Sequence, residues 1–182
     1  MDRQQEAVLV ERVAQGDRAA FGVLLSEHQQ PLSRYARRML SDHSAADDIV
    51  QETFVRLWTR ASSFDSSAAR LTTWLHNIAH NLCMDSFRRN SRIEFTDDDA
   101  RLESADAGPD VNLESMDTAE RVRIAVQGLP ERQRSALLMC HYQGLSNRDA
   151  AHILDLSVDA LESLLARARR RLKEELLRND EP

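Results

Sequence analysis

Cysteine, proline, glycine and aromatic residues are all scarce in this chain of 182 residues. It contains two cysteines, four prolines and five glycines, and only 5% of its residues are aromatic. Cys83 and Cys140 lie too far apart in the sequence to suggest a disulfide framework, so we expect a reducing, cytoplasmic location. No apolar run is long enough for a signal peptide or a membrane-spanning helix, so we expect no membrane insertion.

Strand patterns are missing as well. The chain has no run of alternating β-branched residues, whereas alanine, leucine, arginine and glutamate, which favour helices, are plentiful. The sequence therefore predicts an all-α fold. At this length the helices could form one medium domain or two small ones.

Acidic residues are concentrated in the middle of the chain. The formal net charge is −6, yet residues 91–118 hold nine acidic and two basic residues and alone carry −7. This segment mixes acid, Ser, Gly and Pro with apolar residues at no regular period, and it is long for an ordinary loop. We predict a flexible acidic linker over residues 93–117 that joins domains over residues 5–92 and 118–178. The alternative is a solvated surface loop within a single domain.

Amphipathic patterns predict about four helices in the first domain. Two upstream patterns are broken near Gly16 and at Pro31. Ser44, with Asp47 three residues later, predicts a capping box that starts a helix over Ser44–Trp58. Its expected core face consists of Ile49, Val50, Phe54, Leu57 and Trp58, and its outer face of Asp48, Gln51, Glu52 and Val55.

A further helix is predicted over Thr72–Arg89, after the polar loop "SSFDSS". Helical spacing predicts one buried stripe and one polar face. The stripe consists of Trp74, Leu75, Ile78, Leu82 and Phe87. The opposite face presents Asn77, Asn81, Asp85 and Arg88.

The second domain begins with a helix from about Thr118 to Val126, and Pro130 starts another that ends near Gly144. Ser146 is expected to cap a short helix, with Asp149 at its third position, and Ser157 to cap the last one. Short helix, tight turn and long helix form a helix-turn-helix motif. Asp155 occupies the turn and tolerates a left-handed backbone. Small residues are expected where the helices cross, at Ala150 and Ala151, with core residues at Ile153, Leu156, Val158, Leu161 and Leu165.

Enzymatic signatures are weak. His76, His80 and Cys83 share one side of a helix and could offer ligands to a metal, but the same positions fit a helix edge beside the core stripe. No glycine-rich phosphate loop, nucleophile elbow or paired-carboxylate signature is present. We therefore expect no enzymatic activity, no cofactor and no metal.

The arginines of "RARRR", residues 167–171, suit contacts with DNA phosphates because they follow a helix-turn-helix motif. The alternative is a solvated helix end whose arginines pair with Glu174 and Glu175. The motif itself also occurs in proteins that bind other proteins.

Four blocks of sequence together resemble a known family. They are "DDIVQETFVRLW", "TTWLHNIAHNLCMDSFRR", "LPERQRSALLMCHYQGLSNRDAAHILDLSV" and "RARRRL". In this order and spacing they resemble the extracytoplasmic-function (ECF) group of bacterial sigma-70 family sigma factors, over residues 5–92 and 118–176. The resemblance implies a transcription initiation subunit that binds core RNA polymerase, directs it to promoters and helps to open the duplex. The two domains would be the family's region 2 and region 4.

The resemblance also implies roles for particular residues. The clamp helices of the largest polymerase subunit would contact Asp48, Gln51, Glu52 and Val55, and the polymerase flap would hold region 4. The single-stranded −10 element would contact Asn77, Asn81, Asp85, Arg88 and Arg89, with Asn81 near a flipped base. The −35 duplex would contact Ser157, Asp159, Ala160, Glu162, Ser163, Arg167, Arg170 and Arg171. The acidic linker would thread through polymerase channels, and an anti-sigma factor would be a further partner.

Two positions depart from the family pattern, because Glu162 and Leu164 stand where relatives often carry basic residues. We expect weak binding of the −35 element by region 4 alone. Glu162 or Asp159 would either accept a hydrogen bond from a cytosine amino group or face away from DNA. Leu164 would form an exposed ridge with Leu161 and Leu165 for a protein partner, or it would widen the core stripe.

Two other functions remain as alternatives to a sigma factor. One is a stand-alone helix-turn-helix regulator whose first domain senses a ligand or partner. The other is a metal-dependent helical enzyme around His76, His80 and Cys83.

Overall fold

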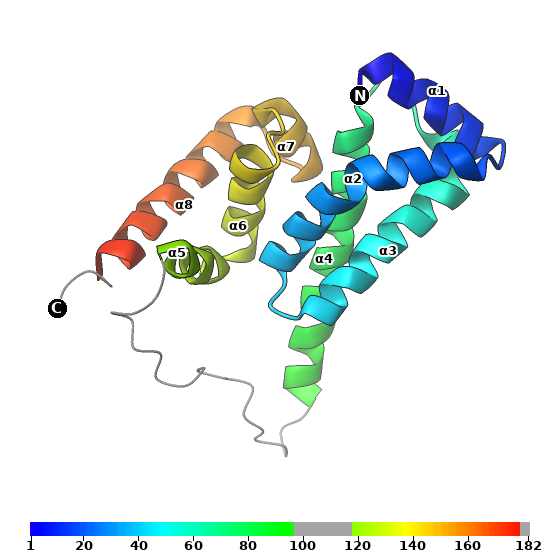
Figure 1. The fold of residues 1–182 in the computed structure, drawn as a ribbon. Coiled ribbons are helices and arrows are strands. Elements are labelled where there is room, and N and C mark those ends of the chain that lie inside the picture. The colour runs from blue at the N-terminus through cyan, green and yellow to red at the C-terminus, as the bar shows by residue number, and fades with distance from the viewer. Residues whose placement is uncertain (97–117, 179–182) are drawn as a thin grey trace.

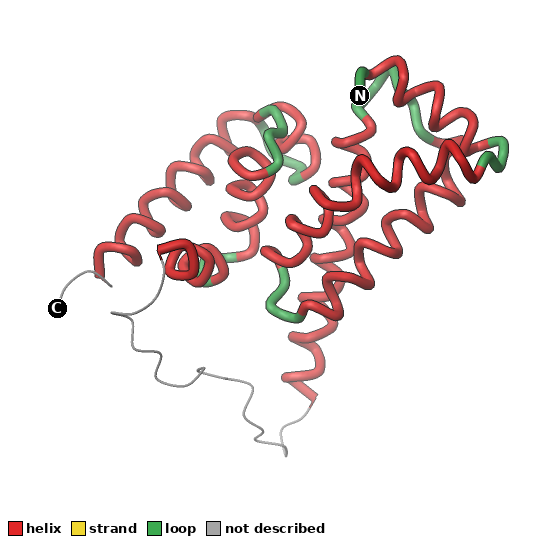
Figure 2. The backbone as a smooth tube through the Cα atoms, viewed as in Figure 1, coloured by secondary structure: helices red, strands yellow, loops and turns green. Residues whose placement is uncertain are grey.

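A computed structural model describes the backbone of residues 1–96 and 118–178, and the side chains of residues 1–89 and 118–178. Most of the predicted linker, residues 97–117, lies outside the described residues. Within the described part every regular element is helical, with short loops between the helices (Figure 2), so the all-α prediction is confirmed.

The helices form two groups (Figure 1). The first consists of α1 (Arg3–Ala14), α2 (Arg18–Met39), α3 (His43–Arg60), a short 3₁₀ turn η1 (Ala61–Ser63) and α4 (Leu71–Thr96). The second consists of α5 (Thr118–Gln127), α6 (Glu131–Leu137), the π-helical turn η3 (Leu138–Tyr142), α7 (Asn147–Ile153) and α8 (Val158–Arg178). The second group packs on α2 and α4, whereas α3 lies on the far side of the first group.

The start of α3 differs from the prediction. Asp42, not Ser44, is the N-cap, and its carboxylate accepts hydrogen bonds from the backbone N–H groups of Ser44 and Ala45 at 2.8 and 3.2 Å. A carboxylate caps as well as a hydroxyl and also interacts favourably with the positive end of the helix dipole. Asp47 is therefore not a capping-box partner, and it pairs with Arg37 of α2 at 2.9 Å.

The predicted break at Pro31 is also wrong, because α2 is one helix of 22 residues that continues through this residue. Proline in a helix interior costs about 3 kcal/mol. Tertiary packing offsets that cost, because the buried face of α2 runs past Pro31 on both sides, from Leu24 and His28 to Leu32 and Tyr35. The break near Gly16 is confirmed, at a positive φ of 86° between α1 and α2.

The buried side of α4 is centred one step away from the predicted stripe. Leu71, Leu75, Ala79 and Cys83 are at most 1% exposed. Of the predicted stripe only Leu75 is buried, whereas Trp74, Ile78, Leu82 and Phe87 are half-buried at its edges. The small residues Ala79 and Cys83 mark the line where α4 packs between α3 on one side and α2 and α7 on the other.

The helix-turn-helix motif forms as predicted. The Ser146 hydroxyl accepts a hydrogen bond from the Asp149 backbone N–H, and the Ser157 hydroxyl accepts one from that of Ala160. Asp155 adopts the expected left-handed conformation, with φ 52°. The predicted core position of Val158 is wrong, because this side chain is 39% exposed at the first position of α8.

Leu164 is buried, which decides between its two predicted roles. The buried face of α8 runs through Leu161, Leu164, Leu165 and Ala168, at the spacing of one helical stripe. The prediction of an exposed ridge formed by Leu161, Leu164 and Leu165 is therefore wrong, and Leu164 widens the core stripe instead.

Arg134 of α6 connects the two helical groups. Its guanidinium donates to the carbonyl oxygen of Met39 at 2.5 Å, and to those of Gln127 and Leu129. Met39 ends α2 and Gln127 ends α5, so a single cation lies at the negative ends of two helices. The side chain is partly buried, and this burial lowers its pKa.

Apolar packing and a second cation support the same contact. Buried side chains of both groups belong to one connected hydrophobic core. The Arg38 guanidinium of α2 lies over the Tyr142 ring at 4.2 Å, and that of Arg134 lies 5.9 Å from the Phe87 ring centre. The two groups are therefore packed as one body in this conformation.

Candidate functional sites

The outer face of α3 is placed as predicted. Asp48 and Gln51 are exposed, Val55 is 48% exposed, and the half-buried Glu52 accepts a hydrogen bond from Arg56 at 2.8 Å. These side chains point away from the core that Ile49, Phe54 and Leu57 help to form.

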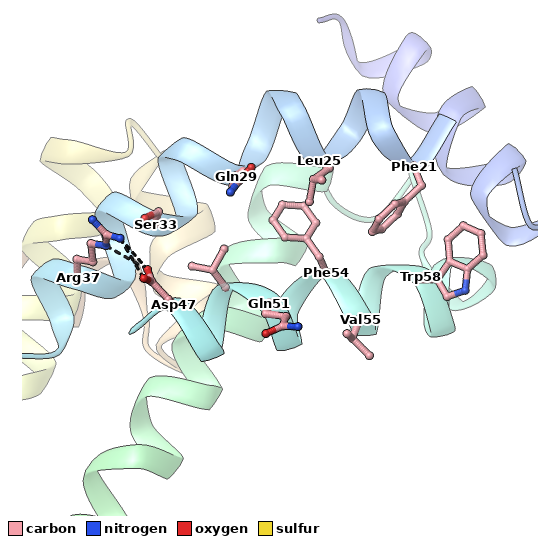
Figure 3. A pocket seen from close by; sticks show the side chains of 11 residues that line it. Phe21, Leu25, Gln29, Ser33, Arg37, Asp47, Gln51, Phe54, Val55 and Trp58 are labelled. Atoms are coloured by element: carbon pink, nitrogen blue, oxygen red, sulfur yellow. Dashed lines mark hydrogen bonds and ion pairs between the residues drawn. The ribbon is translucent and has the colours of Figure 1, made fainter. Parts of the chain in front are cut away.

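A groove of about 640 Å³ between α2 and α3 borders this face (Figure 3). Its aromatic wall is Phe21, whose ring meets those of Phe54 and Trp58 edge-on at 6.3 and 5.3 Å. Arg37 and Asp47 form an ion pair at one end. The remaining lining residues are Leu25, Gln29, Ser33, Val50, Gln51 and Val55.

The α2 half of this groove was missed in the sequence. Phe21 and Leu25 lie four residues apart, beside the buried stripe that contains Ala20 and Leu24. Phe21 and Leu25 make the apolar face of α2 wider than the stripe that packs on a neighbouring helix. This extra width was the signal in the sequence for an exposed apolar surface.

The polar face of α4 also exists. Asn81, Asp85, Arg88 and Arg89 are exposed and Asn77 is half-buried. The Asn81 amide donates to Asn77 Oδ1 at 3.1 Å, and Arg88 donates to Asp85 at 2.5 Å. Arg89 lines a crevice of about 370 Å³ together with Asp48 and Glu52 of α3, so the predicted polymerase and −10 residues adjoin each other.

The loop before α4 is held by a residue that sequence reasoning missed. Arg3 of α1 donates to the carbonyl oxygens of Ser66 and Ser67, at distances from 2.6 to 3.1 Å. Within the loop, the Ser67 hydroxyl and backbone N–H donate to Asp65, and these bonds lower the pKa of Asp65. Arg3 and Ser66 are 63 residues apart in the sequence, so no local sequence pattern indicates their contact and only the fold reveals it.

The predicted −35 residues lie along α8. Asp159, Glu162 and Ser163 are exposed in its first two turns, as are Arg167, Arg170 and Arg171 further along, whereas Ala160 is half-buried. Ser157 is exposed but serves as the N-cap. The arginines line a polar crevice of about 370 Å³ with Gln133, Glu174, Glu175 and Arg178. Glu175 pairs with Arg178 at 3.7 Å.

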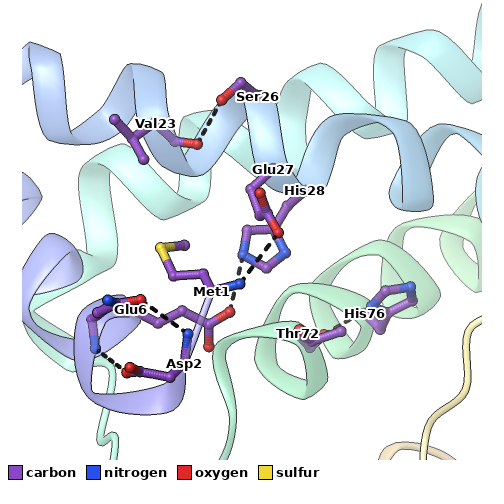
Figure 4. A network of polar contacts seen from close by, with 10 residues as sticks. Met1, Asp2, Glu6, Val23, Ser26, Glu27, His28, Thr72 and His76 are labelled. Carbon is purple, nitrogen blue, oxygen red and sulfur yellow. Dashed lines mark hydrogen bonds and ion pairs between the residues drawn. The ribbon is translucent and has the colours of Figure 1, made fainter.

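The histidines of α4 are buried in the packed body. His76 is 1% exposed and its Nδ1 lies 2.8 Å from the Thr72 carbonyl oxygen. Figure 4 shows this end of α4 beside a second buried polar cluster, in which His28 of α2 faces Glu6 of α1 at 3.5 Å. His80 is 6% exposed, and its Nδ1 lies 3.1 Å from the Tyr35 hydroxyl.

Among residues 1–89 and 118–178, whose side chains are described, no group of three or more His, Cys, Asp or Glu side chains is arranged to hold a metal ion, so His76, His80 and Cys83 do not form such a group. Burial raises the pKa of Cys83 to about 12, because the charged thiolate is disfavoured in apolar surroundings. Nor is any helix of the described part both long and apolar enough to cross a membrane.

The geometry defines a class of protein: a helical chain that carries a helix-turn-helix motif and, between α2 and α3, an apolar groove. Family models agree, since "Sigma-70 region 2" matches residues 24–93 and "Sigma-70, region 4" matches residues 119–172. Together with the relatives below, they show that the chain belongs to the ECF group of the sigma-70 family of RNA polymerase sigma factors.

Relatives match over nearly the whole chain. RNA polymerase sigma factor NccH of Alcaligenes xylosoxydans xylosoxydans is 32% identical, over 94% of each chain. ECF RNA polymerase sigma factor SigM of Mycobacterium tuberculosis is 35% identical, over 94% of this chain and 84% of its own.

Solved structures share the arrangement. CnrH in complex with the cytosolic domain of CnrY matches with a TM-score of 0.71 and 29% identity, over 97% of this chain and 99% of that one. The sigma factor RpoE in complex with the anti-sigma factor NepR from Bartonella quintana matches with a TM-score of 0.72 and 28% identity, over 86% and 96%.

The buried His80 generates a prediction about pH. Burial, and secondarily the nearby Arg132, lowers the pKa of His80 to about 4, compared with 6.5 for an unperturbed histidine. Below pH 6.5 the unfolded chain binds a proton at this position and the folded chain does not, so acidification favours unfolding. Between pH 7 and pH 5, His80 should lower the free energy of unfolding by about 2 kcal/mol.

The His80→Gln variant, measured by urea denaturation at both pH values, should lose about 2 kcal/mol less than the parent protein over this range. Burial also lowers the pKa values of His28 and His76, so part of the loss remains in the variant. An equal loss in both proteins would contradict a buried neutral His80.

Proposed function

We propose that this chain acts as the initiation subunit of a bacterial RNA polymerase, binding the core enzyme through α2 and α3 and the promoter through α4 and α8. The observation that carries the proposal is the separation of two surfaces on one chain. An aromatic-walled groove suited to protein lies on α2 and α3, and an arginine-rich face suited to phosphate lies on α8. The chemistry of RNA synthesis would belong to the polymerase, and the chain would work in the cytoplasm without enzymatic activity of its own.

The α2 and α3 groove has the composition of a protein interface. Its floor is apolar and aromatic, and its rim carries Gln51 and the Arg37 and Asp47 pair. Such a core and rim are typical of protein interfaces, in which a few buried aromatic contacts supply most of the binding energy. The clamp helices of the largest polymerase subunit are the proposed occupant. Asp48, Gln51, Glu52 and Val55 would border them.

The α4 face suits a melted single strand. The Asn81 amide can donate and accept hydrogen bonds at the edge of an unstacked base, and the bond to Asn77 fixes its orientation. Arg88 and Arg89 would contact the backbone. Arg3 would keep the adjacent loop in place as one wall of the site. On α8, Arg167, Arg170 and Arg171 would contact duplex phosphates near the −35 element.

Promoter binding would separate the two helical groups. A packed chain of this length is roughly 40 Å across. The −35 and −10 elements are centred about 25 base pairs apart, roughly 85 Å along B-form DNA. The packed body therefore falls short of the distance between the elements. The 21 residues between α4 and α5 can span at most about 70 Å, so separation along the DNA is within the reach of the chain.

A protein inhibitor is a further proposed partner. The two solved structures compared above are complexes, one with the cytosolic domain of CnrY and one with the anti-sigma factor NepR. An anti-sigma factor of this kind would restrict the present chain by covering polymerase- or DNA-binding surfaces. Because Leu164 is buried, it would not be part of that interface.

Reconstituted transcription tests the proposed function. Added to bacterial core RNA polymerase, the chain should give transcripts that start at defined positions on a promoter library, and neither component should do so alone. The chain alone should bind duplex DNA weakly, because the polymerase is missing and the proposed −10 contacts require a melted strand. Tight, sequence-specific binding without polymerase, combined with no promoter-specific transcript, would instead identify a stand-alone regulator.

The groove can be tested with a matched pair of variants. Val55 and Val23 are both 48% exposed helical valines, but only Val55 lines the groove. Val55→Glu should weaken binding to core polymerase about tenfold or more, because it places an unpaired charge against an apolar interface. Val23→Glu adds the same charge and should leave the affinity unchanged, as measured by fluorescence anisotropy. Equal losses in both variants would reject the groove as the docking site.

Arg134 tests the contact between the two helical groups. Arg134→Ala leaves three carbonyl oxygens without their charged donor and should lower the free energy of unfolding by about 2 kcal/mol. It should also raise the radius of gyration measured by small-angle X-ray scattering. Arg123→Ala removes an exposed arginine that pairs with Glu120 and should change stability by less than about 1 kcal/mol. Unchanged stability and radius in Arg134→Ala would contradict this role.

A further inference from the structure

The two helices of the helix-turn-helix motif are joined at their exposed edge by one polar contact. The Asn147 amide Nδ2 donates to Glu162 Oε1 at 3.3 Å. Asn147 is the first residue of α7, directly after the cap Ser146, and Glu162 lies in the second turn of α8. Both side chains are exposed, so the pair lies on the surface and not in the core between the helices.

The contact determines what the pair can offer to a ligand. Asn147 uses an N–H donor and keeps its carbonyl oxygen, and Glu162 keeps its second carboxylate oxygen. The start of α8 therefore presents oxygen acceptors, and the arginine donors follow only from Arg167 onward. Asn147 also restricts the carboxylate to one side of α8, which lowers the entropy that Glu162 would lose on binding.

Oxygen acceptors select among bases in the major groove. Cytosine presents the N4 amino group and adenine the N6 amino group, whereas guanine O6 and N7 and thymine O4 are acceptors. A carboxylate close to duplex DNA lowers affinity for every sequence through repulsion by the phosphates. Glu162 therefore favours binding only where a base donates a hydrogen bond to it.

We propose that Asn147 and Glu162 together set the base preference at one position of the −35 element, in favour of a base that presents an amino group. Glu162 accepts the hydrogen bond from the base, and Asn147 is a positioning residue that holds the carboxylate. This inference rests on the proposed function, because it assigns a specificity to the promoter contact of α8.

Promoter selection measures the preference directly. The full chain and core polymerase transcribe a library with a randomised −35 element, and sequencing of the transcripts gives the base preference at each position. Glu162→Gln should shift the preference at one position about fivefold or more towards adenine, because glutamine both donates to and accepts from that base. Asn147→Ala should flatten the preference at the same position. The double variant should show no additional change from Asn147→Ala, because both residues act through one contact.

Asp155→Asn is the control. It removes one negative charge from the exposed turn between α7 and α8, and asparagine also tolerates the left-handed backbone at this position. It should raise transcription from all library members alike without changing base preference. This pattern separates base reading from general electrostatics.

The outcomes distinguish the inference from the proposed function. Promoter-specific transcription by the parent protein, with base preference unchanged in Glu162→Gln and Asn147→Ala, would overturn the inference and leave the sigma function intact. The absence of promoter-specific transcription by the parent protein would overturn both. A melting temperature equal to that of the parent protein shows that each variant folds, as expected for two exposed positions.

Discussion

The conformation depends on one partly buried cation at the ends of two helices. Carbonyl groups in the last turn of a helix lack partners within the helix and carry partial negative charge. Arg134 satisfies such groups at the end of α2 and the end of α5, and so connects the two helical groups. Desolvation of the guanidinium opposes this contact and lowers its pKa, but the three carbonyl acceptors offset that cost. The burial of His80 and the covered side of α4 both depend on the same packing.

That packing also separates the surfaces by chemistry. The groove beside Val55 remains open because the second helical group packs on α2 and α4 and not on α3. On α4, the side that carries His76 is covered, and the side that carries Asn81 remains accessible. The arginines of α8 face solvent at a third place, away from the groove and from the polar side of α4. The surfaces proposed for the polymerase, for a melted strand and for duplex DNA therefore lie on different helices.

Local chemistry made much of this predictable. The caps at Ser146 and Ser157 and the left-handed Asp155 form as expected, because hydrogen bonds within four residues decide them. The outer face of α3 follows from its period. Local rules failed where two local solutions competed or where packing outweighed propensity. Asp42 caps α3 although Ser44 is equally suitable, and α2 continues through Pro31 because its flanks are buried.

The sequence alone determined that the chain is helical, that α3 exposes a polar outer face, and that a helix-turn-helix motif precedes a run of arginines. The tertiary structure alone decided which positions are covered, because burial depends on the partner that meets each face. Val158 is therefore exposed although its spacing predicted a core position, and Leu164 is buried, which decides between its two predicted roles. The bond from Asn147 to Glu162 joins residues 15 apart, so no local pattern could reveal it. Only the crossing of two helices brings these side chains together.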